Sequence, residues 1–525
     1  MTRGHTLAGM GTRTARTRRP RAASIARPAP DLGERPESTP TTGLPRVLAA
    51  ALVFLASGAV LVLEILSVRL LAPYVGLTLE TTTSIIGAVL AGIALGAALG
   101  GRLADRINPR WLLVALFVLG GLLVLLTVPI IRALGPSASE GGNAAAIGVT
   151  FAALVPLAAV LSGITPTVAR LQLRDLRASG TVVGGLSAWA TAGALAGTFG
   201  TGFVLVPLFP VSATVTAIGI ALVLVGGALG LYLRALGKTA LVATAIVFFG
   251  VVALAAAQHS PCEAESGYHC IQVEEDPSGR NAKILLLDRG LNSDVDVSEP
   301  SYLGFPYERW LAETIEAMGA PRAPLNGVFV GGGAFTMPRW LNAVRPGSRS
   351  TVLEVDGKLV DFDREHLGLR TSPGLRAVVG DARLSIRRQP THSADVIVGD
   401  AFSSRTVPWQ LMTTEWLKEV KRVLKPGGIY LLNMIDYPPL ALFRAESATL
   451  LAAFAHVRLT TLIGEGGKLL GGTEVLAASS APLPAVRHAP GNEGHVLGRA
   501  AVVRLVAGAQ RLRDDYAPVD QLETR

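Results

Sequence analysis

The sequence predicts two structural parts, a multi-pass α-helical membrane domain followed by an α/β domain with a doubly wound sheet. Half of the 525 residues are hydrophobic and only 17% are charged, which is unusual for a purely soluble protein. The apolar residues gather between positions 47 and 257 in stretches long enough to cross a bilayer. After His259, charged residues recur regularly and apolar strand candidates alternate with intervals of helical length.

Residues 1–46 form a basic tail. They contain nine arginines, with Asp31, Glu34 and Glu37 as the acids. The tail has too little apolar surface to fold, so we predict that it is disordered. A nucleic-acid-binding arm is disfavoured because no aromatic residues are interleaved, and no nucleic-acid partner is expected. A cleavable signal peptide is also disfavoured, because the apolar run after Arg46 is too long.

The region 47–257 is predicted to contain about seven transmembrane helices. Seventeen basic residues lie in the tail and in the loops on its side of the membrane, whereas the opposite loops hold only Arg132. The positive-inside rule then places the amino terminus in the cytoplasm, and seven crossings place the soluble domain outside a cell membrane. The apolar stretches lie near 47–72, 83–100, 111–131, 145–169, 182–207, 211–233 and 239–257.

Two features inside the apolar stretches have alternative interpretations. Gly92, Gly96 and Gly100 recur every four residues, which favours a smooth stripe for close helix packing. Glu64 and Arg69 are charges within the first stretch and lie near its predicted outer end. Such charges can mark a transport path, but local pairing or snorkelling is favoured here.

The soluble half is predicted to hold a parallel, doubly wound sheet over residues 326–482, because the intervals between most strand candidates suit crossover helices. Before it, the segments CIQVEED and AKILLLDRGLNS predict a small antiparallel lid within 258–325, and residues 483–525 form a carboxy-terminal extension. The strand candidates are 327–330, 351–355, 376–379, 394–398, 429–434, 457–462 and 474–478.

Four strand ends carry residues suited to binding a ligand. The glycines Gly331, Gly332 and Gly333 end the first strand, and Glu354, Asp381 and Asp400 end the next three, where open α/β sheets bind ligands. Glu354 lies 21 positions after the last glycine, close to the spacing of a carboxylate that accepts hydrogen bonds from both ribose hydroxyls. Asp381 is placed to contact an adenine amino group. The alternative, that these acids only cap helices, is strongest for Asp381.

Several motifs together resemble one family. FVGGG, VLEVDGKLV, VVGDARLSI, ADVIVGDAFSS and LKPGGIYLLN, preceded by LLLDRGLNS and FPYERWL, resemble the spermidine synthase (polyamine aminopropyltransferase) family, and more narrowly its membrane-fused spermidine-synthase-like proteins. The resemblance covers about residues 268–480. It implies a Rossmann-like, methyltransferase-type seven-stranded sheet with an amino-terminal β-lid. It also implies transfer of an aminopropyl group from decarboxylated S-adenosylmethionine to a diamine.

The resemblance also implies roles for individual residues. An amine must be neutral to attack a carbon beside a sulfonium, so such an enzyme needs carboxylates that hold the amine and accept its proton. The implied co-substrate is decarboxylated S-adenosylmethionine or S-adenosylmethionine, and no metal is implied. Asp400 occupies the catalytic position, where a carboxylate accepts the proton. Asn292 matches a donor-binding position and Tyr307 an acceptor-binding position. The positions that match the nucleoside site are Gly331, Gly332, Gly333, Glu354 and Asp381.

Three positions depart from the family pattern. Ala334 replaces the aspartate of a Gly-Gly-Gly-Asp-Gly turn, and Ser403 replaces the second aspartate of the pair begun by Asp400. Arg309 stands where a glutamate follows the tyrosine. These losses put an ordinary cationic diamine in doubt. Arg309 and Arg339 are either suited to an anionic or neutral acceptor or are structural.

Two functions therefore remain open. The first is a membrane-anchored aminopropyl transferase that acts on a small amine. The second is a membrane protein that binds a nucleoside or polyamine without turnover or assists transport, and the loop GGRLADRINPR (100–110) does resemble a short loop of major-facilitator transporters. The lipid bilayer is a partner in both, and a homo-oligomer is compatible with both.

The two cysteines bear on the side of the membrane. Cys262 and Cys270 lie eight positions apart, just after the last predicted membrane exit. They can pair in an oxidising compartment, whereas a C-x-x-C spacing for a metal or redox site is absent. A disulfide would agree with an outward-facing domain.

Overall fold

The computed structural model describes most of the chain after Gly43, and every structural statement below concerns those residues. Residues 44–525 group as one compact unit. Residues 1–43, which belong to the basic tail, lie outside the described residues. Ser403 also lies outside them. The described ranges are 44–75, 79–140, 142–173, 179–235, 237–257, 260, 262–277, 280–288, 290–402, 407–486 and 488–523.

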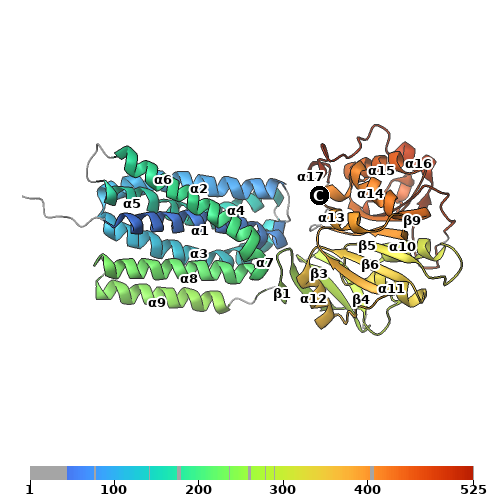
Figure 1. Ribbon diagram of the computed structural model, residues 1–525, viewed down its shortest axis with the longest axis horizontal. Helices are drawn as coiled ribbons and strands as arrows, with labels where there is room; N and C mark the ends of the chain where they lie inside the picture. The colour runs from blue at the N-terminus through green and yellow to red at the C-terminus, as the bar shows by residue number, and fades with distance from the viewer. Residues whose placement is uncertain are drawn as a thin grey trace, which may run out of the picture. The chain divides into compact units, whose positions relative to one another are not determined.

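The first half of the described chain is helical, and its helices run side by side (Figure 1). Among the described residues, 6 helical segments are long and apolar enough to cross a membrane, and they coincide with the first six predicted stretches. The seventh stretch is also a helix, but its apolar part, Thr239–Ala255, is shorter, so a seventh crossing stays a prediction. The bounds are α1 Arg46–Val75, α2 Leu79–Arg106, α3 Pro109–Glu140, α4 Gly142–Ser162, α5 Ile164–Gln172, α6 Ser179–Gly200, a π-helical turn Thr201–Leu205, α7 Val206–Leu208, α8 Val211–Tyr232 and α9 Lys238–Ala257.

The glycine stripe of α2 is a packing surface, as the sequence favoured. A Cβ atom at Gly96 would lie 2.1 Å from the carbonyl oxygen of Ala159 on α4, and one at Gly100 would lie 2.5 Å from the Cα of Gly163. No side chain fits between backbones this close. The absence of a Cβ atom therefore allows α2 and α4 to touch along the stripe.

We expect Gly96→Leu to destabilise the helical part, whereas Gly87→Leu on the same helix should not. A Cβ at Gly87 has no atom within 4 Å, so the control adds the same side chain in open space. Forcing a side chain into the packed site should cost about 1 to 3 kcal/mol or more. Thermal unfolding of both variants in the same detergent measures the difference. Equal melting temperatures would contradict this packing role.

The second half contains an 8-stranded sheet in the order β12-β10-β11-β9-β8-β5-β6-β7. All seven strand candidates are strands of this sheet, and the central strands from β7 to β9 pair in parallel as predicted. The bounds are β5 Asn326–Val330, β6 Arg349–Glu354, β7 Leu375–Val379, β8 Ala394–Gly399, β9 Leu424–Asp436, β10 His456–Thr461, β11 Gly472–Ser479 and β12 His495–Leu497.

Two details of the sheet differ from the prediction. Strand β11 is antiparallel to β9 and to β10, since the connection 462–471 is too short for the crossover that parallel neighbours need. The sheet also has an eighth strand, because β12 from the carboxy-terminal extension pairs antiparallel with β10. Its three residues carry no apolar alternation long enough to predict a strand.

The predicted lid is a separate antiparallel sheet of four strands in sequence order. CIQVEED forms β2, and AKILLLDRGLNS supplies β3 and the start of β4. The short β1 adds a fourth strand that the sequence did not predict. The bounds are β1 Ala264–Glu265, β2 Cys270–Glu275, β3 Ala282–Leu287 and β4 Gly290–Asp296.

Helices cover both faces of the large sheet (Figure 1). Trp310 of α10 (Pro306–Glu316) is buried in the core of one face, together with apolar residues of α11 (Thr336–Val344). Trp416 of α14 (Thr414–Val423) is buried in the core of the other face with α15 (Ala441–Ala453). These two layers fix the strands, so the residues at the carboxyl ends of β5, β6, β7 and β8 lie along one edge.

Candidate active site

The turn after β5 requires its glycines. Gly331 has a φ of 98° and Gly333 a φ of 49°, both in the left-handed region. A Cβ atom at Gly331 would lie 2.3 Å from the carbonyl oxygen of Asp400, so the turn passes directly against the end of β8. This close approach leaves backbone, not side chains, facing the space above the sheet.

Glu354 is fixed by the backbone around it. Its Oε2 accepts a hydrogen bond from the Gly332 amide at 2.6 Å, and its Oε1 accepts one from the Asp356 amide at 2.8 Å. Burial raises the pKa of the Glu354 carboxyl, although these two hydrogen bonds oppose the shift. Each oxygen keeps a further lone pair, so the carboxylate can still accept hydrogen bonds from a ligand.

Asp400, at the end of β8, is held by two side chains. The Tyr307 hydroxyl donates to its Oδ2 at 3.3 Å, and Asn433 Nδ2 donates to its Oδ1 at 2.8 Å. Loss of water contact raises the pKa of Asp400 to about 6, although the hydrogen bonds from Asn433 and Tyr307 lower it. A carboxyl with this pKa accepts protons readily near neutral pH.

Asp381 caps a helix, the alternative that the sequence left strongest for Asp381 among the acids of the set. Its Oδ1 accepts hydrogen bonds from the amides of Arg383 at 2.6 Å and Leu384 at 3.3 Å, at the start of α13 (Ala382–Ser385). Asp381 also lines the cavity described next, so a contact with adenine stays a prediction. Asn292 of β4 lines the same cavity, and its Oδ1 accepts a hydrogen bond from the Ser293 hydroxyl at 2.8 Å.

Two cavities meet at Asp400. The larger has a volume of about 740 Å³ and is lined by the glycine turn, Asn292, Glu354, Asp381 and Asp400. The smaller, of about 330 Å³, shares the glycine turn, Asn292 and Asp400 and adds Tyr307. The fold thus brings together every predicted ligand-contacting residue. Among the residues that the structure describes, no group of three or more His, Cys, Asp or Glu side chains is placed to hold a metal.

Sequence reasoning missed two residues of this site, Asn433 and Glu308. Asn433 lies on β9, which is parallel to β8, so its position beside Asp400 follows from strand order. Glu308 is only 1% exposed and accepts a hydrogen bond from the Phe305 amide at 3.2 Å. Burial and the neighbouring Asp294 raise the pKa of Glu308 well above its usual value. Its place three residues into a helix is the signal that could have identified it as a capping residue.

The structure shows which groups surround Ala334, Arg309 and Arg339. Ala334 is fully buried in an apolar cluster that includes lid residues. The Arg309 guanidinium donates to the Leu303 carbonyl at 3.4 Å. Arg339 donates to the Leu367 carbonyl at 2.7 Å. Both arginines bond backbone carbonyls, which agrees with the structural interpretation of these residues.

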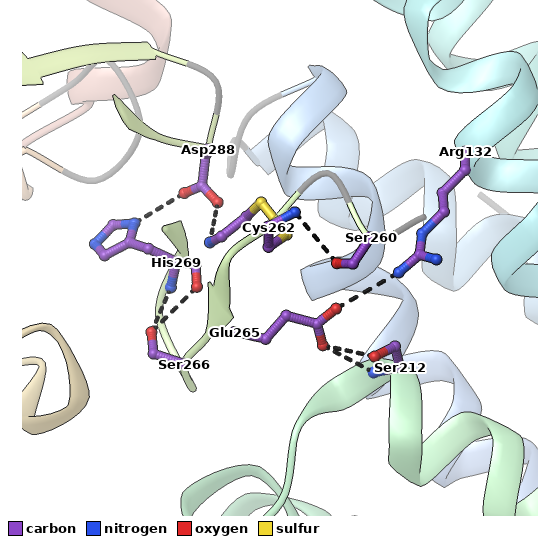
Figure 2. The surroundings of a disulfide bond; sticks show 9 residues. Arg132, Ser212, Ser260, Cys262, Glu265, Ser266, His269 and Asp288 are labelled. Atoms are coloured by element: carbon purple, nitrogen blue, oxygen red, sulfur yellow. Dashed lines mark hydrogen bonds and ion pairs between the residues drawn. A yellow bond between two sulfur atoms is a disulfide. The ribbon is translucent and has the colours of Figure 1, made fainter. Parts of the chain in front are cut away.

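A disulfide joins Cys262 to Cys270 at the base of the lid (Figure 2). The Cys270 amide donates to Asp288 Oδ1 at 3.0 Å. Nearby, Glu265 accepts hydrogen bonds from the Ser212 hydroxyl at 2.9 Å and amide at 3.1 Å and pairs with Arg132 at 3.6 Å. The lid hairpin is therefore bonded to α3 and to the start of α8.

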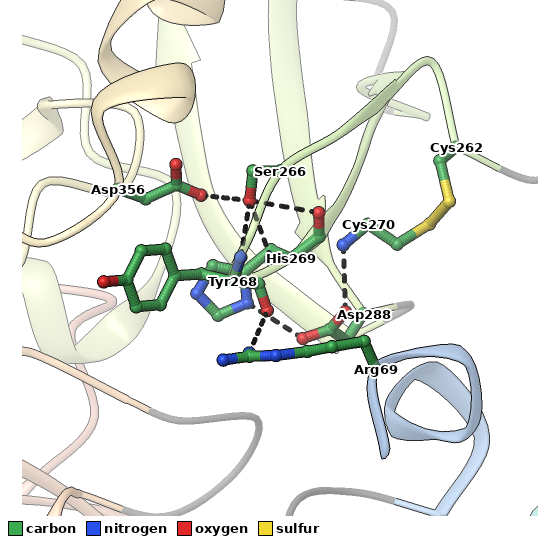
Figure 3. A network of polar contacts seen from close by, with 8 residues as sticks. All are labelled: Arg69, Cys262, Ser266, Tyr268, His269, Cys270, Asp288 and Asp356. Carbon is green, nitrogen blue, oxygen red and sulfur yellow. Dashed lines mark hydrogen bonds and ion pairs between the residues drawn. A yellow bond between two sulfur atoms is a disulfide. The ribbon is translucent and has the colours of Figure 1, made fainter. Parts of the chain in front are cut away.

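A second polar network links α1, the lid and the residues that follow β6 (Figure 3). Arg69 donates to the Tyr268 carbonyl at 3.4 Å, and its guanidinium lies 5.6 Å from the Tyr268 ring centre. The charged side chain of Arg69 is therefore in contact with the lid. His269 Nδ1 lies 2.8 Å from Asp288 Oδ2. Burial lowers the pKa of His269, but the hydrogen bond and charge of Asp288 outweigh it and the net shift is upward.

This network reaches Glu354 through two further residues, Ser266 and Asp356. Ser266 donates to the carboxylate of Asp356, whose amide in turn donates to Glu354. Arg69, Tyr268 and His269 also line the 740 Å³ cavity. The end of α1 and the lid therefore form part of the wall of the larger cavity.

Comparison with known proteins supports one family. No family model matches the chain. It is 29% identical over 154 residues to "Polyamine aminopropyltransferase" of Vibrio vulnificus (strain CMCP6), covering 29% of this chain and 50% of the relative. It is 29% identical over 174 residues to "Probable polyamine aminopropyl transferase" of Bifidobacterium longum (strain NCC 2705), covering 33% of this chain and 36% of the relative.

The chain spans half or less of the length of these relatives. A solved structure, a probable spermidine synthase from Corynebacterium glutamicum ATCC 13032, is 26% identical, with 48% of this chain and 95% of that chain covered and a TM-score of 0.44. The sequence matches to curated relatives support a spermidine-synthase-like family.

Proposed function

We propose that the chain is a membrane-anchored transferase that moves an aminopropyl group from decarboxylated S-adenosylmethionine to an amine acceptor. The observation that carries the proposal is Asp400, a carboxyl with a pKa of about 6 that lies where the two cavities meet. The larger cavity is proposed to hold the nucleoside, with Glu354 on the ribose and Asp381 near the adenine. Asn292 and the glycine turn are proposed to contact the donor.

The residues of the site have separate tasks in this reaction. The sulfonium donor supplies a carbon with a good leaving group: the amine nitrogen forms a bond to that carbon while the carbon–sulfur bond breaks and its electron pair stays on sulfur. Asp400 accepts the proton that the nitrogen must lose and passes it to solvent. Tyr307 and Asn433 orient the Asp400 carboxylate so that it faces the acceptor.

The proposal is tested with the purified full chain in detergent. Decarboxylated S-adenosylmethionine is mixed with a panel of small amines, and products are identified by mass. We expect an aminopropylated amine and the thioether nucleoside in equal amounts. If the nucleoside binds but no amine yields a product with this donor or with S-adenosylmethionine, the transferase proposal is wrong.

That second result would favour a non-catalytic protein that binds a nucleoside or polyamine or assists transport. The observation behind this alternative is the loss of the family's carboxylates at Ala334 and Arg309. The alternative predicts equal nucleoside affinity for the native chain and for Asp400→Asn, and no product from either.

The pH dependence follows from the pKa of Asp400. A base must be deprotonated to accept a proton, so turnover should fall as the pH drops through about 6. The Tyr307 hydrogen bond lowers this pKa, so Tyr307→Phe should move the acid limb of the kcat profile to higher pH. Activity that stays constant between pH 5 and pH 8 would contradict the assignment of Asp400 as the base.

We further propose that the amino terminus is cytoplasmic and the soluble domain extracytoplasmic. A membrane-impermeant thiol reagent on intact cells tests this with Cys262 and Cys270, the two cysteines of the sequence. We expect labelling only after mild reduction, since an outward domain would keep the disulfide. Labelling that needs permeabilised membranes and no reduction would place the domain in the cytosol, as six crossings instead of seven would do.

A further inference from the structure

Both apolar and polar groups form the wall of the smaller cavity, which Tyr307 and Asp400 line. Its wall includes the side chains of Phe305, Trp310, Ile435 and Leu462. The Nε1 atom of Trp310 donates a hydrogen bond to the backbone carbonyl of Glu493 at 3.1 Å. The polar group of this side chain is therefore paired with the backbone. Among the described residues that line this cavity, Asp400 is the one carboxylate.

One end of the cavity is built to receive a hydrogen-bond donor. Asn433 is 2% exposed, and its Oδ1 is buried without a hydrogen-bond partner among the described residues. Its Nδ2 donates to Asp400 Oδ1, which fixes the orientation of the amide. A buried acceptor without a partner is costly, and a ligand N–H group would satisfy it. Asp400 and Asn433 together suit a single amino group.

Two buried acids near this cavity, Glu308 and Asp294, are not among the residues that line it. Glu308 accepts a hydrogen bond from the Phe305 amide, and burial raises its pKa well above the usual value, which disfavours the charged form. Asp294 lies beside Glu308, and burial raises its pKa as well. Arg309, where the family pattern has a glutamate, is directed to the Leu303 carbonyl. Among its lining residues the cavity therefore has one carboxylate, Asp400, and apolar side chains in another part of the wall.

We propose that the acceptor is a primary monoamine with an apolar or aromatic body, rather than a diamine. This inference rests on the proposed transferase function. The amino group would contact Asp400 and Asn433, and the body would lie against Phe305, Trp310 and Leu462. A second ammonium group would lose its water without gaining a carboxylate, which is strongly unfavourable. Contact with aromatic faces offsets only part of that cost.

Binding to the full chain in detergent tests the inference directly. The donor site is first filled with 5′-methylthioadenosine, which cannot react, and titration calorimetry then compares 2-phenylethylamine with butane-1,4-diamine at pH 8. We expect the monoamine to bind at least about 10-fold tighter, which corresponds to about 1.4 kcal/mol. A diamine that binds equally or more tightly overturns the proposal.

A charge added to the cavity provides a matched pair of variants. Thr473 lines the cavity and is partly exposed, so Thr473→Asp adds a carboxylate and Thr473→Asn adds nearly the same shape without charge. We expect the Asp variant, but not the Asn variant, to raise the affinity for the diamine by about 10-fold, the effect of one added ion pair in a partly buried site. If neither variant changes the diamine affinity, the amine body does not occupy this cavity and the proposal is wrong.

The transfer assay separates this inference from the function on which it rests. Faster aminopropyl transfer to the diamine than to the monoamine would keep the transferase function and overturn the acceptor class. Preferential binding of the monoamine, with no transfer to any amine, would keep the acceptor class for this cavity and overturn the transferase function.

Discussion

Asp400→Asn should lower the turnover of the native chain by about 100-fold or more while leaving nucleoside affinity nearly unchanged. The amide keeps the shape of the carboxyl, but it cannot accept the proton that the attacking amine releases. The larger cavity keeps its other contacts, since Glu354 and the glycine turn are held by backbone hydrogen bonds away from this side chain. Single-turnover kinetics with saturating donor, beside calorimetric nucleoside binding, measures the two quantities separately.

Tyr307→Phe is the matched control for this prediction. It removes the hydroxyl that donates to Asp400 Oδ2 but leaves the carboxylate in place. We expect a loss of turnover well below that of Asp400→Asn, together with the shifted acid limb described above. Full turnover in Asp400→Asn would show that another group accepts the proton.

Glu354→Ala should weaken nucleoside binding by about 1 to 3 kcal/mol, or about 5- to 150-fold. Glu354 lines the larger cavity, and each of its carboxylate oxygens is already oriented by one backbone amide. Removing the carboxylate leaves two ribose hydroxyls without acceptors and frees the Gly332 amide at the glycine turn. Calorimetry with 5′-methylthioadenosine measures the loss.

Two further variants distinguish the loss of the Glu354 carboxylate from a general loss of structure. Glu354→Gln keeps the size and one oxygen, so its loss of affinity should fall between those of the native chain and Glu354→Ala. Arg339→Lys changes a side chain that bonds the Leu367 carbonyl, and it should leave nucleoside affinity unchanged. Unchanged affinity in Glu354→Ala, with an unchanged melting temperature, would exclude Glu354 from the ribose site.

The sequence alone determined the elements and the edge of the sheet where ligands bind. Apolar runs and their spacing predicted the strands from β5 to β11, and the positions of Gly331, Glu354 and Asp400 after these runs predicted that they meet. These features are local: a strand end and a turn are specified by a few neighbouring residues, and the parallel order of the central strands then brings the ends together.

Only the tertiary structure decided what surrounds those residues. Asn433 lies 33 positions from Asp400 and meets it because β9 pairs with β8. Arg69 meets Tyr268 across 199 positions, and β12 joins the sheet from the carboxy-terminal extension. Which side chain faces a cavity depends on strand pairing and helix rotation, which are set by packing between distant segments and leave no pattern in the local sequence. For this reason the sequence could identify the lost carboxylates, whereas the apolar part of the wall of the smaller cavity emerged only from the fold.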